Sequence, residues 1–146
     1  MPVESRYIDA RGYLHATVRE PVSISEIEEG LRRVVTSAQH PANVPTLWDL
    51  REWDFGSVNR SRLMQIIDVR SRHPDRGNAR LALLVKTEVQ FGLSRMYELL
   101  SDSNDLPQLI QVFYSEEEAL NWLLHQEPDR AGDFRNLDDG ASPSRA

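Results

Sequence analysis

Apolar residues recur along the chain in two spacings, which together predict an alternation of strands and helices. Segments 5–10 and 13–19 alternate apolar and polar residues as half-buried strands do, and Gly12 between them predicts a tight turn. The run Leu81–Val85 is continuously aliphatic, as in a strand covered on both faces. Short apolar runs at 46–50 and 109–113 predict two more strands.

Helical spacing dominates the stretches between these strands. A capping box at Ser23 and Glu26 predicts the start of a first helix, which we expect to stop at His40-Pro41 because the residue before proline disfavours helical backbone. Ser57 is expected to open a second helix that ends at His73-Pro74. The inward residues expected for these two helices are Ile24, Ile27, Leu31, Val34, Val35 and Ala38, then Leu63, Ile66 and Ile67.

Two further helices follow the last two strands. Phe91-Gly92 is expected at the entrance of the third helix, whose amides could hold an anion, and a capping box at Ser115 and Glu118 predicts the fourth. The inward residues expected are Leu93, Met96, Tyr97 and Leu100 in the third helix, and Ala119, Leu120, Leu123 and Leu124 in the fourth.

The element order predicts the fold class. A hairpin followed by three strand–helix units favours an α/β domain with a single mixed β-sheet of about five strands and four helices. We assign this domain to residues 1–125. Residues 126–146 are polar, rich in proline and glycine, and without periodicity, so they are interpreted as a C-terminal tail that could pack on the domain or on a neighbouring chain.

Composition excludes several classes of function. The chain of 146 residues has a net charge of −6, which disfavours a general nucleic-acid binder, and it contains no cysteine, which excludes disulfides and thiolate chemistry. The N-terminus has no signal-peptide pattern, and no apolar run is long enough to span a membrane. We therefore expect a cytoplasmic protein.

Three stretches carry a resemblance to a known family: "LWDLREWDF" at 47–55, "FGLSRMYELL" at 91–100 and "QVFYSEEEALNWLL" at 111–124. With the element order, they resemble the STAS domain superfamily, in its SpoIIAA-like branch of anti-sigma-factor antagonists and uncharacterised bacterial proteins. The resemblance covers roughly residues 5 to 125. It implies the same mixed sheet and a regulatory role through contact with a protein.

In those antagonists, a strand ending in Asp leads to an Asp-Ser pair at the next helix, and a kinase phosphorylates the serine. Asp49 matches the strand-end acid, while the pair falls at about Ser57-Val58, so the acceptor position holds Val58 unless the loop is one residue shorter. Capping is the commoner role of a serine at a helix start. We therefore expect Ser57 to be a helix cap, with Ser57→Ala costing roughly 0.5–2 kcal/mol.

The loop after the third strand is the expected place for a site, because ligands of open α/β sheets lie outside the carboxyl ends of the strands. The alternative is a solvated turn with local ion pairs. The candidate partner or ligand face comprises Asp49, Arg51, Trp53, Ser57, Lys86, Phe91, Gly92 and Arg95.

Other residue types offer little chemistry. The four histidines lack metal-site spacing, and no nucleophile, phosphate-loop or cofactor motif is recognisable. His15 is expected on the polar face of its strand, with Tyr13 and Thr17. The arginines of the second helix region are expected to spread around it as solvating charges: Arg60, Arg62, Arg70, Arg72 and Arg76.

These observations predict a non-enzymatic binding or regulatory module without a cofactor or metal. Its partner would be a protein or a small ligand, and a homodimer is compatible with this interpretation. The alternative is a carrier of a small apolar or anionic ligand held between sheet and helices near Trp53, Lys86 and Arg95. An enzyme with a site assembled only by folding is the third hypothesis.

Overall fold

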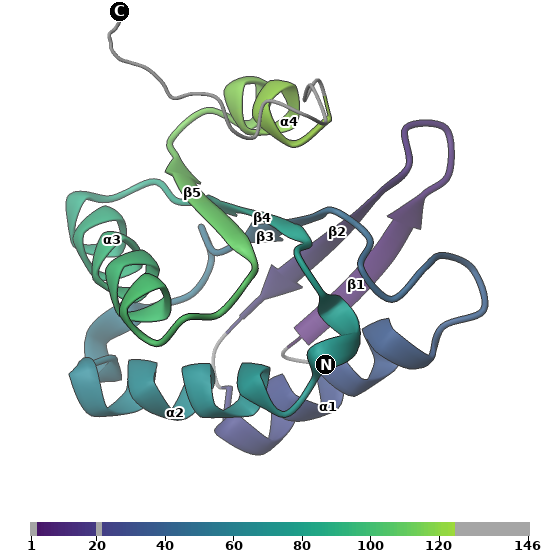
Figure 1. The fold of residues 1–146 in the computed structure, drawn as a ribbon. Helices are drawn as coiled ribbons and strands as arrows, with labels where there is room; N and C mark the ends of the chain where they lie inside the picture. Colours follow the sequence, from purple (N-terminus) through teal and green to yellow (C-terminus); the bar gives the residue numbers. More distant parts are fainter. Residues whose placement is uncertain (1–2, 20–21, 125–146) are drawn as a thin grey trace, which may run out of the picture.

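A computed structural model describes residues 3–19 and 22–124 of the chain (Figure 1). The element order is the predicted one, with two additional short 3-10 turns. The elements are β1 (Val3–Ile8), β2 (Tyr13–Val18), α1 (Ile24–Thr36), β3 (Thr46–Asp49), η1 (Phe55–Ser57), α2 (Arg60–Ser71), η2 (Pro74–Arg76), β4 (Arg80–Leu84), α3 (Glu88–Ser103), β5 (Leu109–Phe113) and α4 (Glu116–Leu124).

The strands form one mixed sheet in the order β1-β2-β3-β4-β5. β1 and β2 pair antiparallel through a turn in which Gly12 has a φ of +76°, while the other neighbours pair parallel. Positive φ suits glycine because it lacks a Cβ. The predicted α/β fold with a single five-stranded sheet and four helices is confirmed.

The helices cover the sheet unequally. α1, α2 and α3 lie against one face, and α4 lies against the other (Figure 1). α1 packs closely on the edge strand: a Cβ added at Gly30 would lie 3.0 Å from a methyl group of Val3. β4 contributes to both layers, since Leu83 belongs to the core under α1–α3 and Ala82 and Leu84 belong to the core under α4. The prediction of a strand covered on both faces is confirmed.

The end of α1 differs from the prediction. α1 ends at Thr36, and Ser37 has extended backbone with its hydroxyl accepting from the amide of Gln39, so Ala38 is an exposed loop residue and not an inward helical one. The chain must leave the helix early because Val44, which is 1% exposed, packs beneath it.

α3 begins four residues before Gly92. Its cap is Thr87, in a capping box with Gln90, so Gly92 lies inside the helix and the amide of Phe91 is bonded to the Thr87 carbonyl. The expectation that the Phe91-Gly92 amides could hold an anion is therefore wrong. Met96 is exposed and not inward.

Candidate functional site

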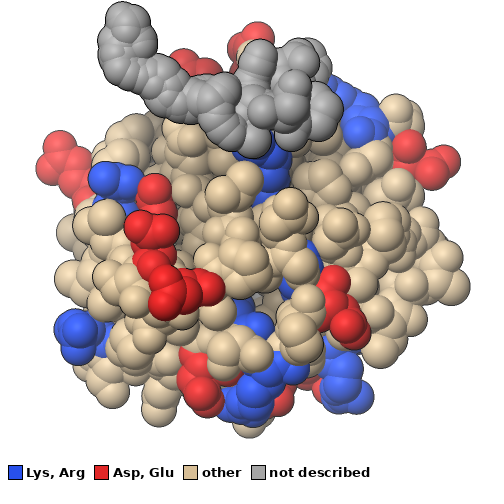
Figure 2. All heavy atoms as spheres, viewed as in Figure 1, with Lys and Arg blue, Asp and Glu red and all other residues tan. Residues whose placement is uncertain are grey.

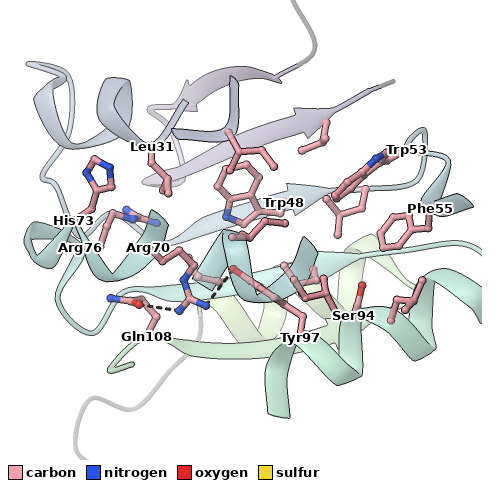
Figure 3. Close-up of a pocket in the computed structure, with 18 residues that line it drawn as sticks. Leu31, Trp48, Trp53, Phe55, Arg70, His73, Arg76, Ser94, Tyr97 and Gln108 are labelled. Carbon is pink, nitrogen blue, oxygen red and sulfur yellow. Dashed lines mark hydrogen bonds between the residues drawn. The ribbon is translucent and has the colours of Figure 1, made fainter. Parts of the chain in front are cut away.

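An apolar cavity of about 90 Å³ lies between the sheet and helices α1, α2 and α3 (Figure 3). One end is aromatic and the other is polar, as the labelled side chains in the figure make visible. The lining comprises Val18, Ile27, Leu31, Trp48, Leu50, Trp53, Phe55, Leu63, Ile66, Arg70, His73, Arg76, Leu81, Leu83, Leu93, Ser94, Tyr97 and Gln108.

The aromatic end is built by the loop after β3. Trp53 and Phe55 pack with their ring centroids 4.6 Å apart, and both are buried. Gln90 of α3 fixes this loop: its side-chain amide donates to the carbonyls of Leu50 and Trp53 at 3.2 and 2.9 Å. The same side chain accepts from the amides of Lys86 and Thr87, so α3 and the loop are tied together.

The polar end is organised by Arg70, which is 7% exposed. Its guanidinium donates to the Tyr97 hydroxyl at 3.1 Å, to Ser101 Oγ at 2.6 Å and to Gln108 Oε1 at 2.8 Å. Its Cζ also lies 5.3 Å from the centroid of the Tyr97 ring. All of these partners are neutral.

Arg76, which is 3% exposed, is the second buried guanidinium at this end. It donates to the carbonyls of Ala42 and Val44 and to Thr46 Oγ1 at 2.8, 3.1 and 3.0 Å. Burial, with a further contribution from the charge of Arg70, lowers the pKa of Arg76 to about 10, so the group remains charged at neutral pH.

No carboxylate balances these two charges within the described ranges. None of the ion pairs found in residues 3–19 and 22–124 includes Arg70 or Arg76. A buried charge is normally paired, because removing it from water is costly. Within the described residues, the polar end of the cavity therefore carries two guanidinium charges that no carboxylate balances.

Two further polar atoms of the lining lack a hydrogen-bond partner among the described residues. They are Oγ of Ser94, a residue 2% exposed, and Nε2 of His73. Figure 3 shows the Ser94 hydroxyl pointing toward the cavity from α3. Unsatisfied buried polar atoms are uncommon in folded proteins and call for a physical explanation.

The structure distributes the predicted site residues over several places. Of the members whose side chains the structure describes, Trp53 alone lines the cavity. Asp49 and Arg51 lie on the α4 side, where Arg51 donates to both carboxylate oxygens at 2.9 and 2.8 Å, and His15 Nε2 lies 3.4 Å from Asp49 Oδ2. Burial raises the pKa of Asp49, but the hydrogen bonds from Arg51 outweigh it and hold the pKa below its ordinary value.

The remaining candidates lie outside the cavity. Lys86 and Gly92 are exposed, and Arg95 is exposed and paired with Glu98 at 2.7 Å. Phe91 is half-buried and stacks on Tyr114, with ring centroids 4.9 Å apart. The predicted ligand position near Trp53 is thus compatible with the cavity, whereas Lys86 and Arg95 do not line it.

Ser57 does not open α2. It ends η1, and the N-cap of α2 is Asn59, whose Oδ1 accepts from the amide of Arg62 at 2.8 Å. The prediction that Ser57 is the helix cap is wrong, because the loop makes a short 3-10 turn before the helix starts. The capping contribution of roughly 0.5–2 kcal/mol belongs to Asn59.

Two other sequence interpretations are also corrected. Tyr13 is buried in the core under α4, so that face of β2 is not simply polar. Arg70 and Arg76 are buried lining residues and not solvating charges. A signal for Arg70 was present: it follows Leu63 by seven positions and Ile66 by four, so it falls on the apolar face of its helix.

No group of three or more His, Cys, Asp or Glu side chains suited to a metal occurs in the described part. Figure 2 shows acidic and basic side chains mainly around the periphery of one face, with a mostly uncharged centre. Among the described helices, none combines the length and apolar character that crossing a membrane requires.

Comparison with known proteins places the fold. No protein-family model matches the chain, and no curated protein matches it. A solved structure is similar: an uncharacterised protein of the DUF3478 family with a SpoIIAA-like fold, from Shewanella loihica PV-4. The TM-score is 0.55 at 16% identity, over 83% of this chain and 91% of the other. The chain therefore has the SpoIIAA-like fold that its sequence resembles.

Proposed function

We propose that this protein is a non-enzymatic binding protein that holds a small molecule in the cavity between the sheet and α1–α3. The observation that carries the proposal is the cavity itself, lined on most sides by aliphatic and aromatic side chains with a few polar groups at one end. Concave, mostly apolar pockets with a few convergent polar groups are typical of small-molecule sites.

The size of the cavity limits the ligand. Its volume of about 90 Å³ would hold about six water molecules at roughly 15 Å³ each. An apolar cavity of roughly 150 Å³ is known to bind benzene, and this cavity is smaller. We therefore expect the buried apolar part of the ligand to be no larger than one ring or a short chain, and smaller than a long acyl lipid.

Tryptophan fluorescence tests this proposal, because Trp48 and Trp53 line the cavity. We expect 2-phenylethanol and 1-hexanol to change the emission saturably, and native mass spectrometry of the purified protein to detect a bound small molecule or added probe. Leu31→Phe should fill the cavity and abolish the response. Leu109→Phe, at an exposed position of β5, is the matched control and should retain it. Equal responses of the two variants, or none in the original protein, would refute the proposal.

A second candidate is a contact module that binds another protein, the role implied by the resemblance to anti-sigma-factor antagonists. The supporting observation is an apolar stripe on the outer face of α3, formed by Val89, Met96 and Leu99, which are 65%, 38% and 57% exposed. Exposed apolar patches often mark interaction sites. We propose that a partner presenting its own apolar surface would cover this stripe, and Gly92 lies within it.

The two candidates differ in what a surface substitution does. Met96→Lys and Leu99→Lys should abolish capture of a protein partner while leaving fluorescence titration with 2-phenylethanol unchanged. Leu31→Phe should have the reverse effect. A homodimer through the same stripe would be detected by light scattering as a change from dimer to monomer in Leu99→Lys.

A further inference from the structure

We infer that the cavity selects organic monocarboxylates, with the carboxylate lying between Arg70 and Arg76 and the apolar part of the ligand toward Trp53 and Phe55. This inference rests on the proposed function, since it assigns the chemical class of the ligand. The feature that carries it is the pair of buried guanidinium groups at one end of an otherwise apolar cavity.

The first argument is the number of donors that remain. A guanidinium has five N–H donors. Arg70 makes three hydrogen bonds within the described residues, and Arg76 also makes three. Each group thus retains donors that the surrounding protein does not use. Planar forks of this kind match the two oxygens of a carboxylate.

The second argument is charge. The charge of Arg70 contributes to the lowered pKa of Arg76, and neither group is paired with an acid in residues 3–19 and 22–124. A bound anion would supply the missing negative charge in a place with little water, where charge pairing is strong. A neutral ligand would leave the repulsion in place, and a cationic ligand would add to it.

The third argument is an unpartnered polar atom beside the arginines. Nε2 of His73 lies at the same end of the cavity as Arg70 and Arg76 and has no hydrogen-bond partner among the described residues (Figure 3). An imidazole N–H at this place can donate to a carboxylate oxygen, which would provide the partner that this buried atom lacks. Oγ of Ser94 faces the cavity nearer to Phe55, beside the apolar part of the ligand (Figure 3).

The geometry favours a carboxylate over a phosphate. The hydrogen bonds to Gln108, Tyr97 and Thr46 use part of the donors of the two guanidinium groups, so a ligand oxygen can accept only from the N–H groups that remain. A carboxylate presents two oxygens in one plane, whereas a phosphate monoester presents three and brings a larger hydration shell. Phenyl phosphate is therefore included in the test as a competing ligand.

The test uses isosteric probes that differ in charge: phenylacetate, 2-phenylethanol and 2-phenylethylamine. Binding to the unmodified protein is measured by tryptophan fluorescence and calorimetry at pH 7. We expect phenylacetate to bind at least about tenfold more tightly than 2-phenylethanol, a ratio that corresponds to about 1.4 kcal/mol. The amine and phenyl phosphate should bind more weakly than the alcohol.

The outcomes separate this inference from the proposed function. Equal or tighter binding of the alcohol would overturn the carboxylate assignment and leave the ligand-binding proposal intact. Tighter binding of phenyl phosphate than of phenylacetate would also overturn the carboxylate assignment. Absence of binding by all four probes, with no response to 1-hexanol, would overturn both.

Variants then assign the selectivity to the arginines. Arg70→Met and Arg76→Met should each reduce the preference for phenylacetate over 2-phenylethanol by at least about tenfold. Arg72→Met is the matched control: Arg72 lies next to α2 outside the cavity, paired with Glu28 and Asp68, and its loss should leave the preference unchanged. If a methionine variant fails to fold, Arg70→Lys and Arg76→Lys replace it, since lysine keeps the charge but not the fork. A preference unchanged in every folded variant would overturn the assignment.

Discussion

The two faces of the sheet differ in how their buried charges are paired. On the α4 face, Asp49 is held by Arg51, His15 lies beside it, and Arg51 also reaches Glu116 at 3.6 Å, so the charges are balanced. On the α1–α3 face, Arg70 and Arg76 are also buried, but they have only neutral partners in the described chain. The balanced cluster has a sufficient structural explanation. The unbalanced one lies beside a cavity, and we therefore assign the ligand to that side.

The same contrast holds for packing. Beneath α4, the side chains of Leu47, Ala82 and Leu84 are fully buried in a continuous cluster. Beneath α1–α3, the apolar residues surround a cavity. A side chain that borders a cavity has fewer neighbouring atoms on one side and so gains less from dispersion.

The largest effect on the free energy of unfolding is expected for leucine-to-alanine substitutions, which we compare between the two faces of the sheet. Leu47→Ala, at a position 0% exposed, should lower the free energy of unfolding by an amount near the top of roughly 2–5 kcal/mol. Leu31→Ala, at the cavity, should fall near the bottom of that range. Urea unfolding of both variants provides the measurement. Equal losses would mean that the two faces are equally well packed.

The next effect concerns the balanced charges. Asp49→Asn should cost roughly 1–3 kcal/mol at pH 7, because it removes the charged acceptor of two hydrogen bonds from the Arg51 side chain. Asp102→Asn, at an exposed position of α3, is the control and should change little.

The same carboxylate predicts a pH dependence. The pKa of Asp49 is lower in the folded protein than in the unfolded chain, so the unfolded state binds more protons in acid. The stabilisation is therefore fully present above about pH 4, the ordinary pKa of an aspartate, and is lost as the pH falls through the lower folded pKa. Thermal melts between pH 7 and pH 2 should have a shallower acid limb in Asp49→Asn than in the original protein. Parallel acid limbs would exclude Asp49 as a source of the dependence.

The smallest effect on stability is expected at Ser94, which is compared with Ser101. Both are serines of α3, and each is 2% exposed. Ser101 Oγ accepts from Arg70, so Ser101→Ala should cost roughly 1–3 kcal/mol. Ser94 Oγ has no partner in the described residues, so Ser94→Ala should change stability by less than roughly 0.5 kcal/mol. Thermal denaturation without ligand measures both. A comparable loss in Ser94→Ala would show that its hydroxyl is already satisfied.

Much of the fold followed from the sequence because each element carries a local signal. The capping box at Ser23 and the aliphatic run that became β4 require no knowledge of distant residues. Boundaries were less accurate where a longer-range demand prevailed. The position of Pro41 is compatible with a helix that continues to His40. The helix ends earlier, at Thr36, and the segment after it packs through Val44, whose carbonyl accepts a hydrogen bond from Arg76.

The site was harder to predict, because its polar end is assembled from separate elements. Arg70 comes from α2, Tyr97 and Ser101 from α3, and Gln108 from the connection to β5. No local spacing joins these positions. Of these residues, Arg70 was the one whose burial the sequence indicated, because it falls within the apolar stripe of its helix. The other arginines of that region are scattered around the helix, and for this reason Arg70 was interpreted as one more solvating charge. The loop residues Asp49 and Arg51, which the topology favoured, instead form the ion pair under α4.

Gln90 has a consequence for recognising relatives of this chain. Its side-chain oxygen accepts hydrogen bonds from two backbone amides, and its NH₂ group donates to carbonyls of the loop that carries Trp53. Glutamate could only accept and lysine could only donate, so neither can replace both functions. Across homologous sequences that keep this loop, position 90 should therefore vary little, even where overall identity is as low as in the Shewanella structure. A preserved side-chain amide four residues before a buried serine, as at Gln90 and Ser94, would be a more reliable marker of this architecture than the surface of α3.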